Sequence, residues 1–144
     1  MAKPTTPLLT VDCVVVDEDG QFLLIRRRNP PFAGRLALPG GFVDVGEPVE
    51  AACRREVREE TGVELGRLEL VGVYSNPDRD PRGHTCSVVF MGRIRRAKAK
   101  AGDDAASVEW RRRWRKDELA FDHHRVLADA RLMLADAGTK ARAR

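Results

Sequence analysis

The chain has 144 residues, a hydrophobic content of 42% and a formal net charge of +4. This length favours one domain over residues 1–144, with an ordered core from about residue 6 to residue 137. No apolar run is long enough to span a membrane, and the first ten residues lack the apolar centre of a signal peptide. We therefore expect a cytoplasmic protein with no membrane partner.

The positive charge could indicate nucleic acid as a partner. The basic residues, however, fall in short separate groups with few aromatic residues among them, so the pattern does not favour base stacking along a basic surface. An anionic small molecule explains the charge equally well. The three cysteines, Cys13, Cys53 and Cys86, lie in apolar segments without paired spacing, which favours buried reduced thiols over disulfides or metal ligands.

The first third of the chain predicts a β-hairpin followed by a loop. Residues 8–16 and 21–26 are apolar and β-branched, and an acidic turn at 17–20 joins them. Residues 27–35 contain two prolines and a glycine, which predicts a loop. Gly40 and Gly41 then allow close approach of the backbone to a ligand or a tight turn, and residues 42–45 predict a short extended piece that Gly46 ends.

The next segment predicts a helix with clear ends. Pro48 suits the first helical position, and Glu47 and Glu50 complement the positive end of the helix dipole. Gly62 supplies the left-handed conformation that commonly follows the last helical turn.

The remaining elements alternate less regularly. We expect strands at 68–74, 84–94 and 108–114, a polar loop at 75–83, a charged loop at 98–105, and a helix from Asp122 to Ala137 that Gly138 stops. Residues 139–144 form a basic tail that we expect to be disordered. The order of three strands, a helix, three strands and a helix predicts the α/β class, with a sheet between helices.

Three acidic residues stand out in the first helix. Glu56, Glu59 and Glu60 follow the spacing i, i+3, i+4, so their carboxylates lie side by side, on or next to the apolar stripe. Such crowding of like charges is unfavourable unless a divalent cation binds there. The alternative is an acidic surface helix in which Arg55 and Arg58 form salt bridges.

The fixed positions around these glutamates resemble the signature of the Nudix hydrolase family. They are Gly41, Glu47, Arg55, Glu56, Val57, Glu59, Glu60, Gly62 and Val63. The resemblance implies an α/β/α sandwich with a mixed β-sheet between helices, and hydrolysis of a nucleoside diphosphate linked to another group. It also implies Mg²⁺, with Mn²⁺ as an alternative, bound by Glu56, Glu59, Glu60 and the carbonyl of Gly41 or Gly40, and an orienting ion pair between Glu47 and Arg55. Family resemblance further suggests a homodimer.

The expected reaction is attack of a cation-activated water on phosphorus. The general base is left open: Glu56 or Glu60 could serve, and the family often uses a carboxylate from a later loop. The candidates there are Asp103, Asp104 and Glu109, and the sequence does not choose among them.

Four stretches outside the glutamate motif, residues 6–16, 26–43, 74–85 and 121–131, together resemble the ADP-ribose pyrophosphatase branch. This resemblance implies ADP-ribose and water as substrates and AMP and ribose 5-phosphate as products. The alternatives are a nucleoside triphosphate pyrophosphohydrolase and a non-catalytic domain that senses ADP-ribose. For substrate contacts, cationic side chains suit the diphosphate and flat side chains suit the base. The candidates for phosphate or ribose oxygens are Arg82, which we prefer, Arg35, Arg27 and Arg79, and the candidates for stacking are Phe42, Tyr74, Phe32 and Trp110; each could instead be a solvated or core residue.

Overall fold

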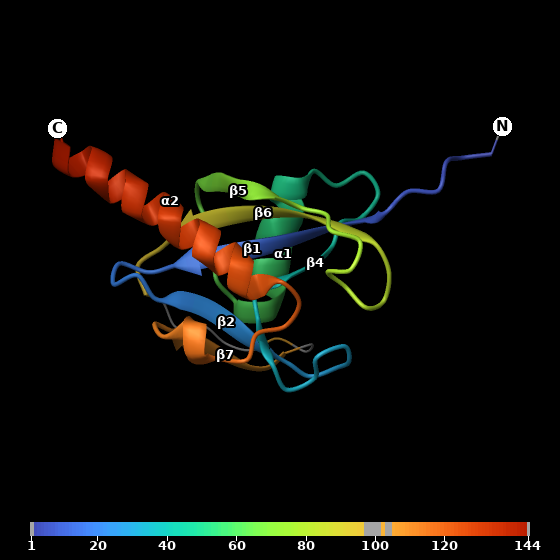
Figure 1. Ribbon diagram of the computed structural model, residues 1–144, viewed down its shortest axis with the longest axis horizontal. Coiled ribbons are helices and arrows are strands. Elements are labelled where there is room, and N and C mark those ends of the chain that lie inside the picture. The colour runs from blue at the N-terminus through green and yellow to red at the C-terminus, as the bar shows by residue number, and fades with distance from the viewer. Residues whose placement is uncertain (1, 97–101, 103–104, 144) are drawn as a thin grey trace.

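The computed structural model describes residues 2–96, 102 and 105–143, with side chains up to residue 138. Its elements in chain order are β1 (Leu8–Val16), β2 (Phe22–Arg27), β3 (Leu36–Ala37), β4 (Gly40–Phe42), α1 (Val49–Thr61), β5 (Leu68–Tyr74), β6 (Thr85–Arg93), β7 (Ala105–Arg111), the 3-10 helix η1 (Trp114–Lys116) and α2 (His123–Ala143). Both helices lie against a central sheet, with α2 in front of it and α1 behind it in Figure 1.

The sheet is mixed. Its main path runs β3-β2-β1-β6-β5, while β4 pairs with β1 and β7 pairs with β2. The central strands β1 and β6 are parallel over their full length, and the other pairs are antiparallel. Because β1 and β2 pair only at Val16 and Phe22, the predicted hairpin exists only at its turn, and the strands then separate to admit β4 beside β1.

The alternating side chains of β1 supply both cores. Val14 and Val16 pack with Val126 and Leu127 of α2 on one face. Residues 11, 13 and 15 pack with Ala52, Cys53 and Val57 of α1 on the other face. A strand buried on both faces reads as a continuous apolar run, which is why residues 8–16 look uniformly hydrophobic. The predicted α/β/α sandwich is confirmed.

Both ends of α1 lie close to the predicted positions. Pro48 is the N-cap residue in extended conformation, so the helix begins one residue later than expected. Gly62 has a φ of 74° and its amide donates to the carbonyl of Arg58 over 2.9 Å. The left-handed cap thus ends the helix immediately after Thr61, where a residue with a Cβ would be strained.

Three other boundaries differ from expectation. Strand β4 is formed by Gly40–Phe42, before the extended piece predicted at 42–45, because the glycines allow it to lie against β1. Strand β7 spans Ala105–Arg111, and the residues expected at its end turn into η1. Helix α2 does not stop at Gly138; it continues to Ala143. The expected disordered tail is therefore wrong for residues 139–143, whose Ala, Lys and Arg are good helix formers.

The three cysteines are free thiols, as predicted. Cys13 and Cys53 are buried where α1 meets β1, and the Cys53 thiol donates to Cys13 Sγ over 2.8 Å. This contact and burial raise the pKa of the Cys13 thiol well above its ordinary value. Cys86, on β6, is partly exposed. Among the described helices, none combines the length and the hydrophobicity needed to cross a bilayer.

Candidate active site on the acidic helix

Two of the three predicted glutamates line one pocket at the end of α1. Glu56 and Glu60 are half-buried and border a cavity of about 460 Å³, together with Gly41 of β4. Glu59 lies beside them with 57% of its side chain exposed. The helix therefore presents three carboxylates at the edge of a cavity, two of them within its wall.

Arg55 binds this acidic cluster from outside. Its guanidinium contacts Glu47 at 2.7 Å, Glu56 at 2.8 Å and Glu59 at 3.2 Å, and it also donates to the carbonyl of Phe42. Burial raises the pKa of Glu56; Arg55 opposes this, but the charges of Glu59 and Glu47 add to the rise. One arginine thus leaves the cluster short of positive charge.

The glycines of β4 hold the backbone against the carboxylates. The amide of Gly40 donates to Glu60 Oε2 over 3.1 Å. A Cβ built on Gly41 would lie 2.6 Å from Glu56 Oε1, closer than van der Waals contact permits. Only glycine therefore fits beside Glu56 without displacing it, and the main chain comes close enough to share a ligand with both glutamates.

The donor set fits a hard divalent cation, because carboxylate and carbonyl oxygens are the ligands that Mg²⁺ prefers. In the part of the chain that the structure describes, no three acidic, histidine or cysteine side chains already enclose a metal position. The reason is visible in the contacts of Arg55, which draws Glu56 and Glu59 to its guanidinium. A cation would have to compete with Arg55 for these oxygens, and the exposed Glu59 is the carboxylate with most room to move.

The candidate bases are placed unequally. Asp103 and Asp104 lie outside the described residues, but Gly102 next to them donates its amide to the carbonyl of Glu60 over 2.9 Å. Glu109 lies on β7, where it accepts hydrogen bonds from Arg26 and Ser107 and borders neither glutamate pocket. Glu109 thus lies away from the glutamate pocket, because the pairing of β7 with β2 directs its carboxylate toward Arg26.

Two of the predicted substrate arginines border the glutamate pocket. Arg27 and Arg82 both line it, and both lie over the ring of Phe121, at 5.1 Å and 5.8 Å from its centroid. Burial, followed by the charge of Arg82, lowers the pKa of Arg27. Phe42 borders the same pocket and lies under Arg82 at 5.4 Å. Arg82 is also paired with Asp80 at 2.8 Å, and the two guanidiniums together supply the kind of donors that bind a phosphate.

Two other substrate candidates are not brought to the glutamates. Arg35 is exposed and lies over Phe32, outside the described pockets. Tyr74 borders a different cavity and donates its hydroxyl to Asp129 over 2.6 Å. Burial and this hydrogen bond raise the pKa of Tyr74. Arg35 therefore lies apart from the glutamate pocket and Tyr74 borders the second cavity, and the part of each in substrate binding stays a prediction.

Comparison with known proteins decides the family. A model described as the NUDIX domain matches residues 6–135. The chain belongs to the Nudix family. It is similar to the ADP-ribose pyrophosphatase of Methanocaldococcus jannaschii, with 48% identity over 85% of this chain and 72% of that protein. The family and this relative establish the chain as a Nudix hydrolase, a class that works with a divalent metal.

Solved structures agree. A MutT/nudix family protein of Enterococcus faecalis has a TM-score of 0.87 at 33% identity, over 94% of this chain and 65% of that one. The NUDIX domain of Shewanella oneidensis NrtR, complexed with ADP ribose, has a TM-score of 0.84 at 31% identity, over 90% of both chains. A longer NrtR chain, of which this chain covers 62%, is complexed with a 27mer DNA.

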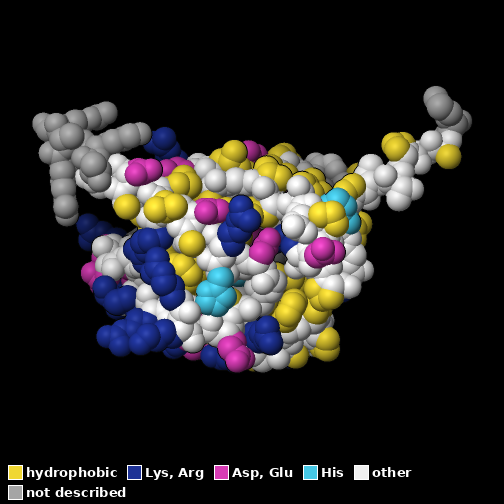
Figure 2. Space-filling view, viewed as in Figure 1, with side chains coloured by type: hydrophobic (Ala, Val, Ile, Leu, Met, Phe, Trp, Pro, Cys, Tyr) yellow, Lys and Arg dark blue, Asp and Glu magenta, His cyan; other side chains and the backbone are white. Residues whose placement is uncertain are grey.

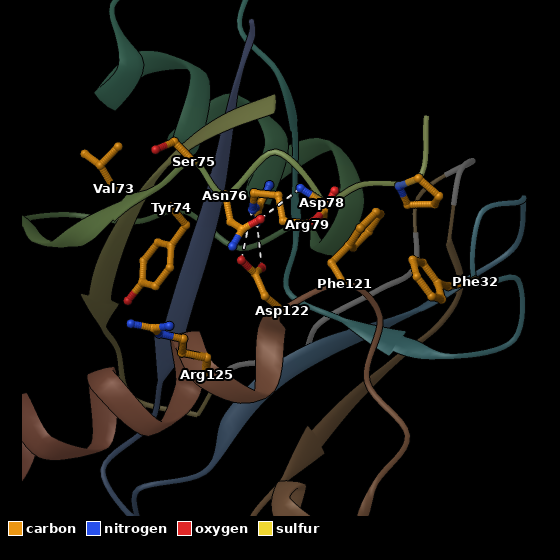
Figure 3. A pocket seen from close by; sticks show the side chains of 11 residues that line it. Phe32, Val73, Tyr74, Ser75, Asn76, Asp78, Arg79, Phe121, Asp122 and Arg125 are labelled. Atoms are coloured by element: carbon orange, nitrogen blue, oxygen red, sulfur yellow. Dashed lines mark hydrogen bonds and ion pairs between the residues drawn. The ribbon is translucent and has the colours of Figure 1, made fainter. Parts of the chain in front are cut away.

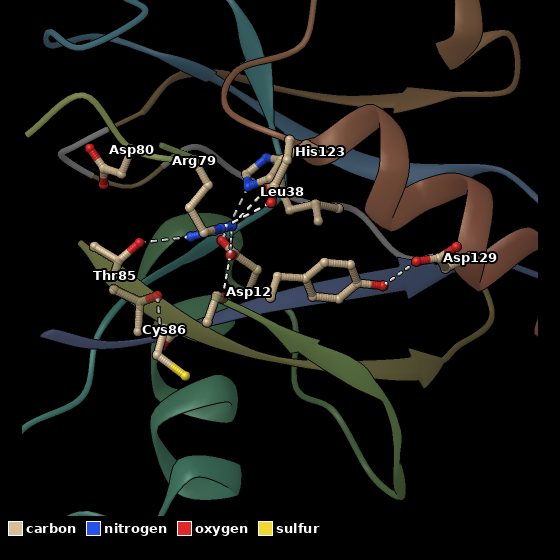
Figure 4. A network of polar contacts seen from close by, with 12 residues as sticks. Asp12, Leu38, Arg79, Asp80, Thr85, Cys86, His123 and Asp129 are labelled. Atoms are coloured by element: carbon tan, nitrogen blue, oxygen red, sulfur yellow. Dashed lines mark hydrogen bonds and ion pairs between the residues drawn. The ribbon is translucent and has the colours of Figure 1, made fainter. Parts of the chain in front are cut away.

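A buried polar network surrounds Arg79, which the sequence offered only as a candidate for contact with the substrate (Figure 4). Arg79 binds Asp122 with two hydrogen bonds of 2.7 and 3.0 Å and donates to Thr85. Its guanidinium also lies 3.7 Å from Asp12, toward which His123 Nε2 points at 3.5 Å. Since His123 Nδ1 accepts the amide hydrogen of Leu38, the neutral ring carries its proton on Nε2, facing Asp12. The one available signal was an aspartate inside the apolar run of β1.

A second cavity, of about 610 Å³, lies on the other side of this network (Figure 3). Three aromatic side chains from separate loops and β5 border it: Phe32, Tyr74 and Phe121. Phe32 and Phe121 meet edge to face at 5.0 Å, and both have positive φ values, 61° and 54°. We call this cavity the aromatic pocket. None of its lining residues belongs to the Nudix motif.

Proposed function

We propose that this Nudix hydrolase cleaves the diphosphate of ADP-ribose with water, releasing AMP and ribose 5-phosphate. The observation that carries the proposal is the pocket in which Arg27 and Arg82 face Glu56 and Glu60. Cationic side chains suit the diphosphate, and the carboxylates suit the cation that accompanies it. The 48% identical ADP-ribose pyrophosphatase supports the choice of substrate.

Each group then has a defined task. Glu56, Glu59 and Glu60, with the carbonyl of Gly41 or Gly40, would hold Mg²⁺, or Mn²⁺ in its place. When bound, the ion neutralises charge on the diphosphate oxygens and lowers the pKa of a water molecule. Arg55, fixed by Glu47, orients Glu56 and Glu59.

Two further roles are binding of the substrate phosphates and removal of a proton from the attacking water. Arg27 and Arg82 bind phosphate oxygens, while Phe42 supports Arg82 from below. The general base comes from Asp103 or Asp104, which follow the residue bonded to the end of α1, or from Glu56 or Glu60.

A substrate panel tests this function directly. Purified protein with Mg²⁺ is offered ADP-ribose, nucleotide sugars and nucleoside triphosphates, in water enriched in ¹⁸O, and the products are identified by mass spectrometry. We expect AMP and ribose 5-phosphate from ADP-ribose, with ¹⁸O in one of them. Dominant release of pyrophosphate from triphosphates would overturn the choice of substrate, and tight binding of ADP-ribose without turnover would indicate a sensor instead.

The partners are part of the same proposal: a small nucleotide substrate, a homodimer and no nucleic acid. Lysine and arginine side chains gather over η1 on the face that α2 crosses (Figure 2), so that surface is the one to test. A mobility-shift assay with duplex DNA and RNA at physiological salt should show no specific complex. Light scattering should show a dimer, and cell fractionation should place the enzyme in the cytoplasm.

A further inference from the structure

The glutamate pocket leaves open where the base of the nucleotide lies. Immediately beside Glu60 is a small cavity of about 70 Å³, room for about two water molecules. Arg79, Phe121 and His123 border this cavity; His123 packs against Phe121, and both His123 and Arg79 lie against Asp12 of β1. A purine cannot enter there unless the buried network comes apart.

The 460 Å³ pocket is unsuited to a base for a different reason. Its lining is dominated by charged side chains, namely Arg27, Arg28, Asp44, Arg55, Glu56, Glu60 and Arg82. Such a lining solvates phosphate and sugar oxygens, but it offers little flat apolar surface. We therefore place the diphosphate and the distal ribose in this pocket.

The aromatic pocket has the opposite character. Phe32, Tyr74 and Phe121 converge on it, Val73 and Pro81 add apolar surface, and Asn76 and Arg125 stand at its border (Figure 3). A volume of about 610 Å³ lies within the range of small-molecule sites. Stacking on aromatic side chains is the usual way for proteins to hold a base.

The pockets adjoin one another. Arg79 and Phe121 border both the aromatic pocket and the small cavity, and the small cavity shares Glu60, Arg27 and Arg82 with the glutamate pocket. The ring of Phe121 therefore lies between the glutamate side and the aromatic pocket, and a nucleotide that binds to both would have to pass this ring. The two positive φ values at Phe32 and Phe121 are costly for residues of this kind, and such conformations concentrate at ligand sites.

We propose that the aromatic pocket is the nucleobase subsite, with the base stacked against Phe32 and Phe121. This proposal rests on the proposed function, since it assigns one half of the same substrate. Under this proposal Phe121 lies between the phosphate site and the base site. Its ring contacts Arg27 and Arg82, which bind phosphate, and it also borders the pocket for the base.

Calorimetry with two fragments of the substrate tests the proposal. AMP carries a base, and ribose 5-phosphate does not. We expect Phe32→Leu to raise the Kd of AMP about tenfold, the loss of one stacking contact, while the Kd of ribose 5-phosphate changes less than twofold. Leu132→Ala, an exposed apolar position on α2, is the control and should change neither. Equal weakening of both ligands, or an unchanged Kd for AMP, would overturn the subsite.

A second experiment needs no variant and so cannot fail through misfolding. An azido-substituted AMP, with the azide on the base, is photo-crosslinked to the intact protein and the modified peptides are sequenced. Labels at residues 32, 73–81 or 121–125 support the subsite; labels confined to 27–29, 40–44 or 55–60 contradict it. Because both experiments use AMP binding, they remain informative even if the substrate panel rejects ADP-ribose, and the two proposals can fail separately.

Discussion

Glu56 and Asp12 face opposite sides of β4, and each lies near an arginine, yet their surroundings shift their pKa values in opposite directions. Burial raises the pKa of Glu56, and Arg55 does not compensate for it. Burial would also raise the pKa of Asp12, but His123, Ser87 and Arg79 outweigh it and lower the value. The carboxylate of Glu56 therefore lacks compensating positive charge, whereas the carboxylate of Asp12 has enough partners to stabilise its charge.

The contacts explain the difference. Arg55 is shared among Asp44, Glu47, Glu56 and Glu59, whereas Arg79 serves two aspartates and has the hydroxyl of Thr85 as a further partner. A cluster with surplus negative charge gains free energy by binding a cation. A balanced buried network gains nothing from a ligand and loses much if one member is removed. The first region therefore suits the binding of a cation, and the second suits a structural role.

The strongest test of this contrast replaces one glutamate charge. We expect Glu60→Gln to reduce turnover of ADP-ribose about a thousandfold or more, because several kcal/mol of charge stabilisation depend on the bound cation. Circular dichroism should show an unchanged fold. Glu50→Gln, in the exposed first turn of the same helix, is the matched control and should keep its rate. Near-normal turnover by Glu60→Gln would remove this residue from the mechanism.

A mutation in the buried network around Arg79 should mainly lower the stability of the protein. Arg79→Ala leaves Asp12 and Asp122 buried without their shared cation, which should lower the free energy of unfolding by about 3–5 kcal/mol. Urea unfolding followed by fluorescence measures the loss. Arg93→Ala, whose pair with Glu69 leaves both side chains more than a third exposed, should cost about 1 kcal/mol or less. Equal losses for the two variants would show that Arg79 is not the centre of the network.

Gly41→Ala probes the fit between β4 and the glutamates. The added Cβ would meet the carboxylate of Glu56 at 2.6 Å, and because that carboxylate ends a flexible side chain, it can move aside. We expect the rate to fall about 10- to 100-fold, as when a metal ligand loses its orientation, with little change in melting temperature. Gly66→Ala is the control, because nothing lies within 4 Å of its Cβ position. A large loss of stability in Gly41→Ala would indicate a scaffold role instead.

The last effect should depend on pH. Burial favours the neutral form of Asp80, but the side chain and amide of Arg82, with the charge of Arg79, outweigh it and lower its pKa. A lowered carboxyl pKa contributes stability above the unfolded value of about 4, and this stability is lost as the pH falls through the folded value. Asp80→Asn should therefore cost about 1.5–3 kcal/mol at pH 7.

The cost of Asp80→Asn should shrink steadily below about pH 4. Urea unfolding at pH 7, 4 and 3 follows the difference between the two proteins. Asp78→Asn, exposed in the same loop, serves as the control. A difference that stays constant with pH would show that the charge of Asp80 is not what stabilises the loop.

The sequence predicted best what is encoded locally. The helix of Glu56 and Glu60 is encoded in one continuous stretch, in which Pro48 and Gly62 mark the two ends and the spacing of apolar residues predicts the helix. Strands 8–16 and 68–74 were equally clear, since their patterns are uninterrupted. The continuation of α2 past Gly138 was missed because glycine ends a helix only where the chain adopts a positive φ, and here it does not.

The network and the aromatic pocket could not be predicted in this way. Asp12, Arg79 and His123 come from three distant segments of the chain. They meet because β1 pairs with β6, which follows the loop of Arg79, and because α2 begins next to them. Phe32 and Phe121 meet because each has a positive φ value in its loop, and phenylalanine in a sequence does not predict a positive φ. Arg35 and Glu109 looked suitable by type alone, but their neighbours direct them elsewhere.

The buried pair Cys13 and Cys53 has a practical consequence. In the folded protein an alkylating reagent can reach only Cys86, because the other two sulfur atoms lie between α1 and β1. Mass spectrometry after a short pulse of reagent would therefore count one adduct per native molecule and three per unfolded one. The chain carries its own internal reporter of whether the acidic helix is still docked, readable in lysates and without any spectroscopic label.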